Sequence, residues 1–240
     1  MKLRNNSTIQ GVEASHFIIE KSSYQIKCGP TQDELRAIFR LRAQVFCEEL
    51  KWVGPMPLET DEYDNCASYI AINKTKHLMG TLRILDHTEN WMLEKQFRGL
   101  APDDLVAAKT QDSCEVTRLA VSKACRNIKF EKNASIADAL YQGLFVYCIS
   151  NNIRYVYMVV STTILRVLRM SGLPCEPISK PQQMEDGVIA VSAKLDWNKF
   201  IEVNSLNHST RLRAYFDALN KAQFNTVFHA DKLNHLRDAV

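Results

Sequence analysis

The stretch from Arg42 to Asp64 (RAQVFCEELKWVGPMPLETDEYD) brings an arginine, two aromatic side chains and an acidic cluster close together. It starts with apolar residues at helical spacing through Phe46 and reaches Trp52. It then breaks at a Gly-Pro loop and ends on ETDEYD at 59–64. Carboxylates and aromatic faces both attract amines and sulfonium groups. We therefore interpret this stretch as the wall of a pocket for a small cationic ligand.

Three further charges stand inside apolar strand-like runs. Arg83 lies in LMGTLRIL, and Glu115 and Arg118 lie in CEVTRLAVS. Buried charges are costly unless they are paired. Glu115 and Arg118 have opposite parity in a two-residue repeat, so they face one side only if the strand twists or bulges between them. From the charges alone, a structural salt-bridge network and a functional site are equally good readings.

Each of these features also has an ordinary interpretation. Acidic runs are usually solvated, and 59–64 lacks the glycine and the 12-residue spacing of a calcium-binding EF-hand. Trp52, Phe46 and Phe97 taken singly are more often core residues than ligand contacts. The basic residues at 123–132 would by default form a solvated loop. Only the joint pattern favours a site.

The elements that must position these residues follow from periodicity and capping. Thr31 and Glu34 form a T-x-x-E capping box at the start of the helix that carries Arg42 and Phe46. Strands are expected at 22–28, 67–73, 78–85, 114–122, 154–160 and 187–195, and helices at 90–98, after residue 135 and at 162–171. This order predicts an α/β fold with a central mixed sheet.

The chain of 240 residues accommodates one large domain with additions at both ends. We expect an extension at 1–20 outside the core, an α/β domain at 21–200 and a helical C-terminal extension at 201–240. The last part of that extension, 226–239, is expected to form a further helix.

Composition excludes several classes of function. The formal charge of +3 is too small to argue for nucleic-acid binding. The N-terminus lacks the apolar run of a signal peptide, and no stretch approaches the length of a membrane span. Seven cysteines are scattered without a CxxC pair, which favours reduced thiols over a disulfide frame or a zinc site. We expect a cytoplasmic protein without a metal site.

The joint pattern resembles the acyl-homoserine lactone synthase (autoinducer synthase) family. The family motif reads R-x3-F-x5-W, E-x-D-x-x-D, a strand arginine, a phenylalanine and E-x-x-R. This chain has RAQVFCEELKW, ETDEYD, TLRIL, MLEKQF and EVTRLAVS. The resemblance spans roughly residues 22–197, and the agreeing positions are Arg42, Phe46, Trp52, Glu59, Asp61, Asp64, Arg83, Phe97, Glu115 and Arg118.

The resemblance implies a GNAT-like, three-layer αβα acyltransferase fold. It implies that an acyl chain passes from acyl carrier protein to the amine of S-adenosylmethionine, with lactone closure and release of methylthioadenosine. S-adenosylmethionine is then a substrate, and no cofactor is implied.

The resemblance also implies a role for each site residue. Arg42 would hold the ligand carboxylate, and Glu115 would act as the base, directly or through water. Arg83 and Arg118 would order the acidic residues and the acyl carbonyl. The acyl chain would lie between the strands at 115–121 and 154–160. The implied S-adenosylmethionine contacts are Arg42, Phe46, Trp52, Asp61 and Asp64, and the implied acyl-pocket residues are Phe97 and Met158.

The acyl donor is argued from the loop before the helix that follows residue 135. Acetyl-CoA enzymes of the wider superfamily cradle pyrophosphate with a glycine-containing loop at this place. Here the stretch RNIKFEKNASIADAL has no glycine. A basic surface without such a cradle favours an acidic carrier protein. The predicted docking residues are Lys123, Arg126, Lys129, Lys132 and Arg166.

Two departures and two rival functions remain. Thr117 stands where the family more often has serine. Met158 stands where makers of 3-oxo-acyl products tend to carry threonine or serine, which favours unsubstituted chains. One rival is an N-acyl amino acid synthase, including the exosortase-associated acyltransferases, and the other is a non-catalytic binding module. The sequence leaves acyl length, C3 substitution, the role of the C-terminal extension and the oligomeric state open.

Overall fold

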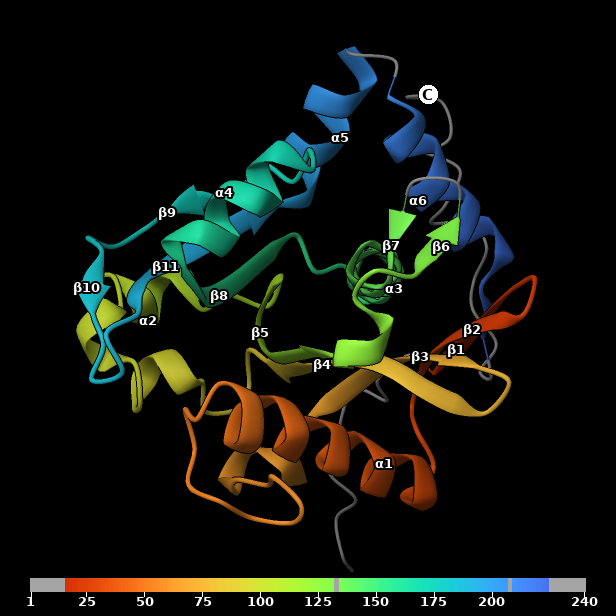
Figure 1. Cartoon of the computed structure of the whole chain (residues 1–240). Coiled ribbons are helices and arrows are strands. Elements are labelled where there is room, and N and C mark those ends of the chain that lie inside the picture. Colours follow the sequence, from red (N-terminus) through yellow and green to blue (C-terminus); the bar gives the residue numbers. More distant parts are fainter. Residues whose placement is uncertain (1–15, 132–133, 207–208, 225–240) are drawn as a thin grey trace, which may run out of the picture.

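The computed structural model describes residues 16–131, 134–206 and 209–224 (Figure 1). A ten-stranded sheet has the order β10-β11-β8-β5-β4-β3-β2-β1-β12, with β9 paired to β11. Its strands are β1 (Phe17–Lys21), β2 (Tyr24–Cys28), β3 (Ser68–Lys74), β4 (His77–Asp86), β5 (Ser113–Val121), β8 (Tyr155–Ser161), β9 (Glu176–Pro177), β10 (Gln182–Gln183), β11 (Ile189–Asp196) and β12 (Gln223–Phe224). A separate pair is formed by β6 (Lys129–Glu131) and β7 (Ala134–Ser135). Among the described strands, only β5 and β8 pair in parallel, so the sheet is mixed, as the sequence predicts.

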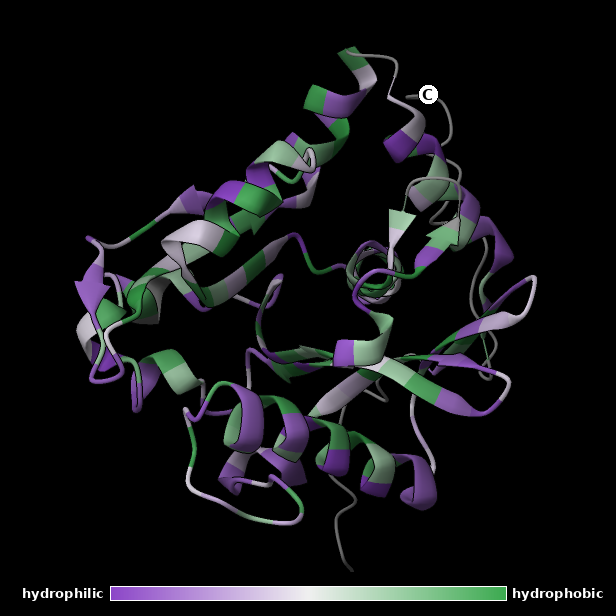
Figure 2. Cartoon of the chain, viewed as in Figure 1, coloured by the Kyte–Doolittle hydropathy of each residue, from purple (hydrophilic) through white to green (hydrophobic). Residues whose placement is uncertain are grey.

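Helices cover both faces of this sheet. They are α1 (Gln32–Arg42), α2 (Leu105–Ala108), α3 (Ile136–Ser150), α4 (Thr162–Met170), α5 (Trp197–Leu206) and α6 (Thr210–Lys221). Alternation along β3 shows the layering, because Ile70 and Ile72 join the core cluster under α3 whereas Tyr69 and Ala71 pack with Ile38 of α1. Figure 2 shows hydrophilic and hydrophobic residues alternating along α1, as expected of a helix with one face on the sheet.

Local signals set the helix boundaries. The predicted capping box is present: the Thr31 hydroxyl accepts the Glu34 N–H, and the Glu34 carboxylate accepts the Thr31 N–H. On the other face, Gly143 lets α3 approach the sheet, because a Cβ there would lie 2.8 Å from Ile26 and Ile70 side-chain atoms.

The two ends of the described chain differ from the sequence prediction. The predicted extension at 1–20 includes β1, whose residues Phe17 and Ile19 are fully buried in the core. The part of the predicted C-terminal extension that follows α6 also joins the sheet, because Phe224 of β12 pairs with Phe17. Strands of five and two residues carry too short a pattern to be recognised from sequence alone. The helix predicted at 226–239 lies outside the described residues.

Two local features between β4 and β8 shape the centre of the molecule. The helix predicted at 90–98 is instead two 3₁₀ turns, Met92–Glu94 and Arg98–Leu100. In addition, β5 and β8 pair only from Ser113 to Glu115 with Tyr155 to Tyr157. Beyond that point β5 stays paired with β4, and β8 stays paired with β11. The facing edges of β5 and β8 are therefore left unpaired toward their C-terminal ends.

Candidate active site

Three arginines and three acids form one ion-pair network beside α1. Arg42 donates to Glu59 and, at 2.6 Å, to Asp64. Arg83 donates to Asp61 and, at 2.6 Å, to the same Asp64 oxygen. The third arginine, Arg118, binds Glu59 and Asp61. The network joins α1, the 59–64 loop, β4 and β5, so it places the predicted charged residues in one cluster.

Arg42 lies inside this network rather than at its surface. Its side chain is 0% exposed, and its guanidinium also donates to Tyr69 at 3.3 Å. Burial lowers the pKa of Arg42, but hydrogen bonds from its guanidinium to Asp64 and Glu59 more than offset this and raise it above its ordinary value. The sequence predicts that Arg42 holds a ligand carboxylate. In this structure Nε and Nη1 of Arg42 bind protein carboxylates, whereas its buried Nη2 has no hydrogen-bond partner among the described residues.

Asp64 is the acid at the centre of the network. Its second oxygen accepts the backbone N–H of Asp61 at 2.8 Å, so both of its oxygens are occupied. Burial raises the pKa of Asp64, but hydrogen bonds from Arg42 and Tyr69 lower it below its ordinary value overall. Asp64 is therefore ionised at neutral pH.

A bulge in β5 brings Arg118 into the network. The register with β4 shifts between Thr81, opposite Ala120, and Arg83, opposite Thr117, so β5 holds one extra residue. Arg118 has φ of +51° at that point, a backbone conformation that side chains other than glycine rarely adopt. Glu115 and Arg118 can share a side only if β5 twists or bulges between them, and β5 has a bulge there.

Glu115 is fully buried and holds the segment after residue 91. Its two carboxylate oxygens accept the backbone N–H groups of Met92 at 2.6 Å and Leu93 at 3.0 Å. Burial raises the pKa of Glu115 to about 7, although these two hydrogen bonds lower it in part. A carboxylate with such a pKa can take up a proton near neutral pH.

The two aromatic residues of the R-x3-F-x5-W motif form a stacked platform in which Phe46 is buried and Trp52 is half exposed. The rings of Phe46 and Trp52 stack with centroids 6.0 Å apart, and Trp52 is 49% exposed. The guanidinium carbon of Arg118 lies 5.4 Å from the Phe46 ring centre. The ion-pair network therefore continues to a flat aromatic surface at the protein exterior.

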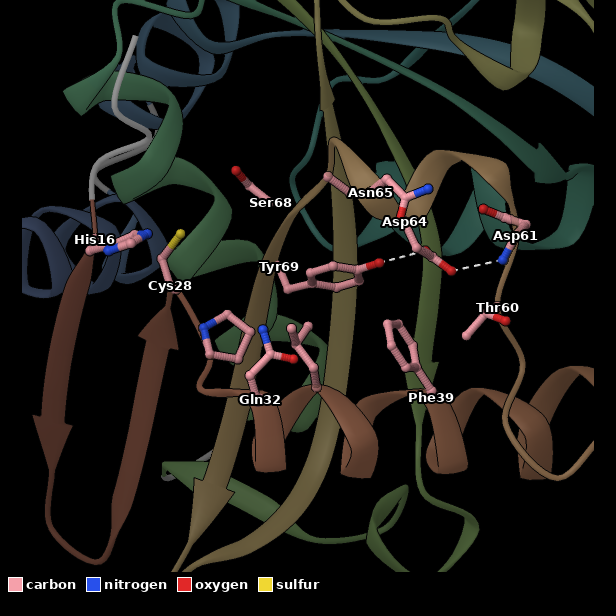
Figure 3. A pocket seen from close by; sticks show the side chains of 14 residues that line it. His16, Cys28, Gln32, Phe39, Thr60, Asp61, Asp64, Asn65, Ser68 and Tyr69 are labelled. Carbon is pink, nitrogen blue, oxygen red and sulfur yellow. Dashed lines mark hydrogen bonds between the residues drawn. The ribbon is translucent and has the colours of Figure 1, made fainter. Parts of the chain in front are cut away.

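The acidic loop also lines a cavity of about 720 Å³, drawn in Figure 3. Figure 3 shows Tyr69, Asp64 and Asp61 linked by hydrogen bonds along its wall. Of the acidic loop, Thr60, Asp61 and Asp64 thus line a cavity. Its lining residues are His16, Cys28, Gly29, Pro30, Gln32, Leu35, Phe39, Thr60, Asp61, Asp64, Asn65, Ala67, Ser68 and Tyr69, so Arg42, Phe46 and Trp52 are not among them.

The two predicted acyl-pocket residues lie in different core clusters. Phe97 packs with Tyr157 and Leu93, whereas Met158 packs in the main core with Leu165 of α4. Because successive residues of a strand face opposite sides, Tyr157 and Met158 mark the two faces of β8. The structure therefore separates Phe97 from Met158 by the sheet.

Most of the predicted docking residues are exposed at the surface. Lys123, Lys129 and Arg166 are exposed, and Arg126 is exposed but paired with Glu49 at 2.6 Å. Lys132 lies outside the described residues. Arg166 stands on α4 beside Ile164 and Val167, which are 46% and 53% exposed.

Two site residues were missed by the sequence analysis. Tyr69 donates to Asp64, and the sulfur of Met92 contacts Arg83 and Arg118. In the sequence, Tyr69 is typical of a strand residue, and Met92 is uncharged, so neither residue type indicates a site.

Within the described residues, no group of three or more His, Cys, Asp or Glu side chains is arranged to hold a metal ion. None of the helices in that part of the chain is long and apolar enough to cross a membrane.

The mixed sheet with helices on both faces matches the fold of solved acyl-homoserine lactone synthases and GNAT-like proteins. A solved CoA-dependent acyl-homoserine lactone synthase, BjaI with SAM and isopentyl-CoA, superposes with a TM-score of 0.59 at 21% identity over 75% of this chain and 84% of that one. FeeM, an N-acyl amino acid synthase from uncultured soil microbes, does so with a TM-score of 0.57 at 14% identity over 80% and 97%. These likenesses show the fold.

The family follows from sequence. Residues 29–202 match the Autoinducer synthase family. An acyl-homoserine-lactone synthase from Aliivibrio fischeri is 35% identical over 166 residues, which are 67% of this chain and 83% of that protein. The chain belongs to the autoinducer synthase family, and it is an acyltransferase of the acyl-homoserine lactone synthase type.

Proposed function

We propose that this chain transfers an acyl group from acyl carrier protein to the amine of S-adenosylmethionine, closes the lactone and releases methylthioadenosine. The choice of acyl donor rests on the N-terminus of α3. Acyl-CoA would have to place its pyrophosphate there, at free backbone N–H groups with a favourable helix dipole.

That helix end already carries its own anion. The Asp138 carboxylate accepts the Ser135 N–H at 2.9 Å, and the Ser135 hydroxyl accepts the Asp138 N–H at 3.1 Å. Asp138 also pairs with Arg211 at 2.8 Å. Burial raises the pKa of Asp138, but the hydrogen bonds from Ser135 and Arg211 bring it below its ordinary value, so the carboxylate is ionised. A second anion there would meet a negative charge and capped N–H groups, which disfavours CoA.

Exposed basic residues suit a carrier protein instead. Lys123 is exposed directly after β5, Lys129 is exposed on β6 beside Tyr24 of β2, and Arg166 is exposed on α4 after β8. The neighbouring Ile164 and Val167 add apolar area, as protein interfaces need at their centre. Long-range attraction by basic groups would speed the encounter with an acidic carrier.

We assign S-adenosylmethionine to the platform of Phe46 and Trp52. A sulfonium group is attracted to an aromatic face, and Trp52 presents one to solvent. Asp61 is the network acid with the most exposed side chain, at 19%, and it adds negative potential toward the amine. Arg42 and Asp64 are assigned to positioning these groups, because their side chains are 0% and 7% exposed.

The reaction itself needs a proton acceptor for the amine and a hydrogen-bond donor to the acyl carbonyl oxygen. We assign the first role to Glu115, reached through water because its side chain is buried, with a pKa of about 7 that suits a general base. Arg118 is the only arginine of the three with exposed side-chain area, 15%, so we assign it to the carbonyl oxygen. The acyl chain would follow the unpaired edges of β5 and β8, which carry the half-buried Leu119 and Val159.

The test uses the purified chain with S-adenosylmethionine and two donors of equal acyl length, acyl-carrier protein and acyl-CoA. The proposal predicts an acyl-homoserine lactone by mass spectrometry, with kcat/KM at least tenfold higher for the carrier protein. Equal or better use of acyl-CoA would contradict the donor assignment. An N-acyl amino acid formed from a free amino acid would instead support the rival that FeeM represents.

A further inference from the structure

Met92 links the buried carboxylate of Glu115 to the exposed arginine of the site. The side chain of Met92 is 3% exposed, and its backbone N–H is held by Glu115 at 2.6 Å. Leu93 is held by the other oxygen of Glu115, so the start of this 3₁₀ turn is fixed to β5 at two points. A residue anchored in this way presents its side chain in one place.

The sulfur of Met92 lies between two guanidinium groups. It is 3.2 Å from Arg83 Nη2 and 3.7 Å from Arg118 Nη1. A thioether sulfur is only a weak hydrogen-bond acceptor, whereas a carboxylate is a strong one for a guanidinium. The two contacts therefore orient the arginines without binding them strongly.

The guanidinium nitrogens of Arg118 differ in the strength of the acceptors that they contact. Nε donates to Glu59 at 3.0 Å and Nη2 donates to Asp61 at 3.2 Å, so both have carboxylate partners. Within the described part of the chain, the recorded partner of Nη1 is the Met92 sulfur. Nη1 is thus the nitrogen of Arg118 whose donor capacity is least used.

We infer that Met92 is a positioning residue that holds Arg118 in place while leaving Nη1 free to donate to the substrate. The inference deepens the proposed function and rests on it, since it assumes that an acyl carbonyl reaches Arg118. A stronger acceptor at position 92 would bind Nη1 and make it unavailable. An apolar residue would remove the orienting contact.

Two substitutions separate these effects. Met92→Leu keeps an apolar side chain of similar volume and removes the sulfur. Met92→Gln has similar length and puts an amide oxygen near Arg118 Nη1. We expect kcat to fall by about tenfold in M92L, and by about a hundredfold in M92Q, which is the effect of losing one donor to a developing oxyanion. The KM for S-adenosylmethionine should stay within about twofold in both, because the platform of Phe46 and Trp52 is untouched.

The matched control is Met79→Leu, since Met79 is equally buried at 2% exposed but packs in the main core. M79L should keep the kcat of the natural chain, and melting temperatures should show M92L and M92Q to be folded. If M92Q keeps kcat within about twofold of the natural chain, the inference is wrong. Should M92Q not fold, a fully active M92L would also overturn it. A natural chain that makes no lactone from either donor would instead contradict the proposed function.

Discussion

Arg42 and Arg83 donate to the same oxygen atom, Oδ1 of Asp64, each at 2.6 Å. The side chains of both arginines are fully buried. Arg42 reaches this oxygen from α1, and Arg83 reaches it from β4. One carboxylate thus joins a helix to the sheet and offsets two positive charges that would otherwise repel each other.

Replacing Asp64 by Asn should destabilise the protein strongly. The change leaves two buried arginines around a neutral acceptor, and breaking a buried ion pair costs about 3–5 kcal/mol. The free energy of unfolding from urea titration measures this. Glu62→Gln is the control, because Glu62 forms an exposed pair with Lys95, and such pairs are worth about 0–1 kcal/mol. Equal losses in the two variants would show that Asp64 does not hold the network together.

Acid should weaken the network in the natural chain but not in D64N. The folded-state pKa of Asp64 lies below its ordinary value, so its stabilisation is present above the unfolded pKa, about 4. It is lost as the pH falls further, through the lowered folded-state pKa. Urea titrations at pH 5 and at pH 3 should therefore show the two variants converging at the lower pH. A constant difference between them would mean that Asp64 is not the titrating group.

Glu115→Gln should abolish turnover. It should also change the pH dependence of stability, in the sense opposite to that expected for Asp64. The folded-state pKa of Glu115 is raised to about 7, so its contribution is greatest below the unfolded pKa, about 4, and falls as the pH rises through 7. E115Q should therefore gain stability relative to the natural chain between pH 5 and pH 8, measured by thermal melting. As a base, Glu115 should also give the natural chain a kcat that rises with pH through about 7. Full activity of E115Q would remove Glu115 as the base.

Trp52→Ala should raise the KM for S-adenosylmethionine about tenfold and leave the KM for the acyl donor unchanged. The side chain is half exposed and stacks on Phe46, so its loss removes a ligand surface at little cost in stability. Leu50→Ala is the control, since Leu50 is 41% exposed nearby. Steady-state kinetics and melting curves check both.

A contrasting variant tests the cavity of Figure 3 as the alternative place for this substrate. Gln32→Trp narrows that cavity from α1. If Q32W raises the KM for S-adenosylmethionine and W52A does not, the methionine substrate binds in the cavity rather than on the platform.

Charge reversal at Lys129 and Arg166 should weaken use of acyl-carrier protein by about tenfold in kcat/KM and flatten its salt dependence. Both side chains are exposed, and as basic groups they would attract an acidic partner over about one Debye length. Lys221→Glu, at the end of α6, reverses one charge at an exposed site and should have little effect. The comparison is made by measuring kcat/KM for acyl-carrier protein at low and high salt in the double variant and in the control. If the control loses as much activity as the double variant, docking is not local to this surface.

The sequence by itself predicted the features that depend on neighbours along the chain. The capping box of Thr31 and Glu34 needs only a four-residue pattern, and the strands β3 and β4 need only two short apolar runs. The ordered motif was also enough to identify the family, because it is a property of sequence.

Tertiary structure decided what the side chains do. Contacts between segments far apart in the sequence decide three features of the site. They bury Arg42, they place Phe97 and Met158 in different core clusters, and they bring the Met92 sulfur to Arg118. The bulge at Arg118 depends on the register with β4, which no local pattern specifies. Burial and hydrogen-bond geometry set the pKa of Glu115 and the exposure of each arginine, and both arise only when α1, β4 and β5 pack together. The sequence alone therefore determined the family and most of the elements, and packing decided which charged residues hold the structure and which face a substrate.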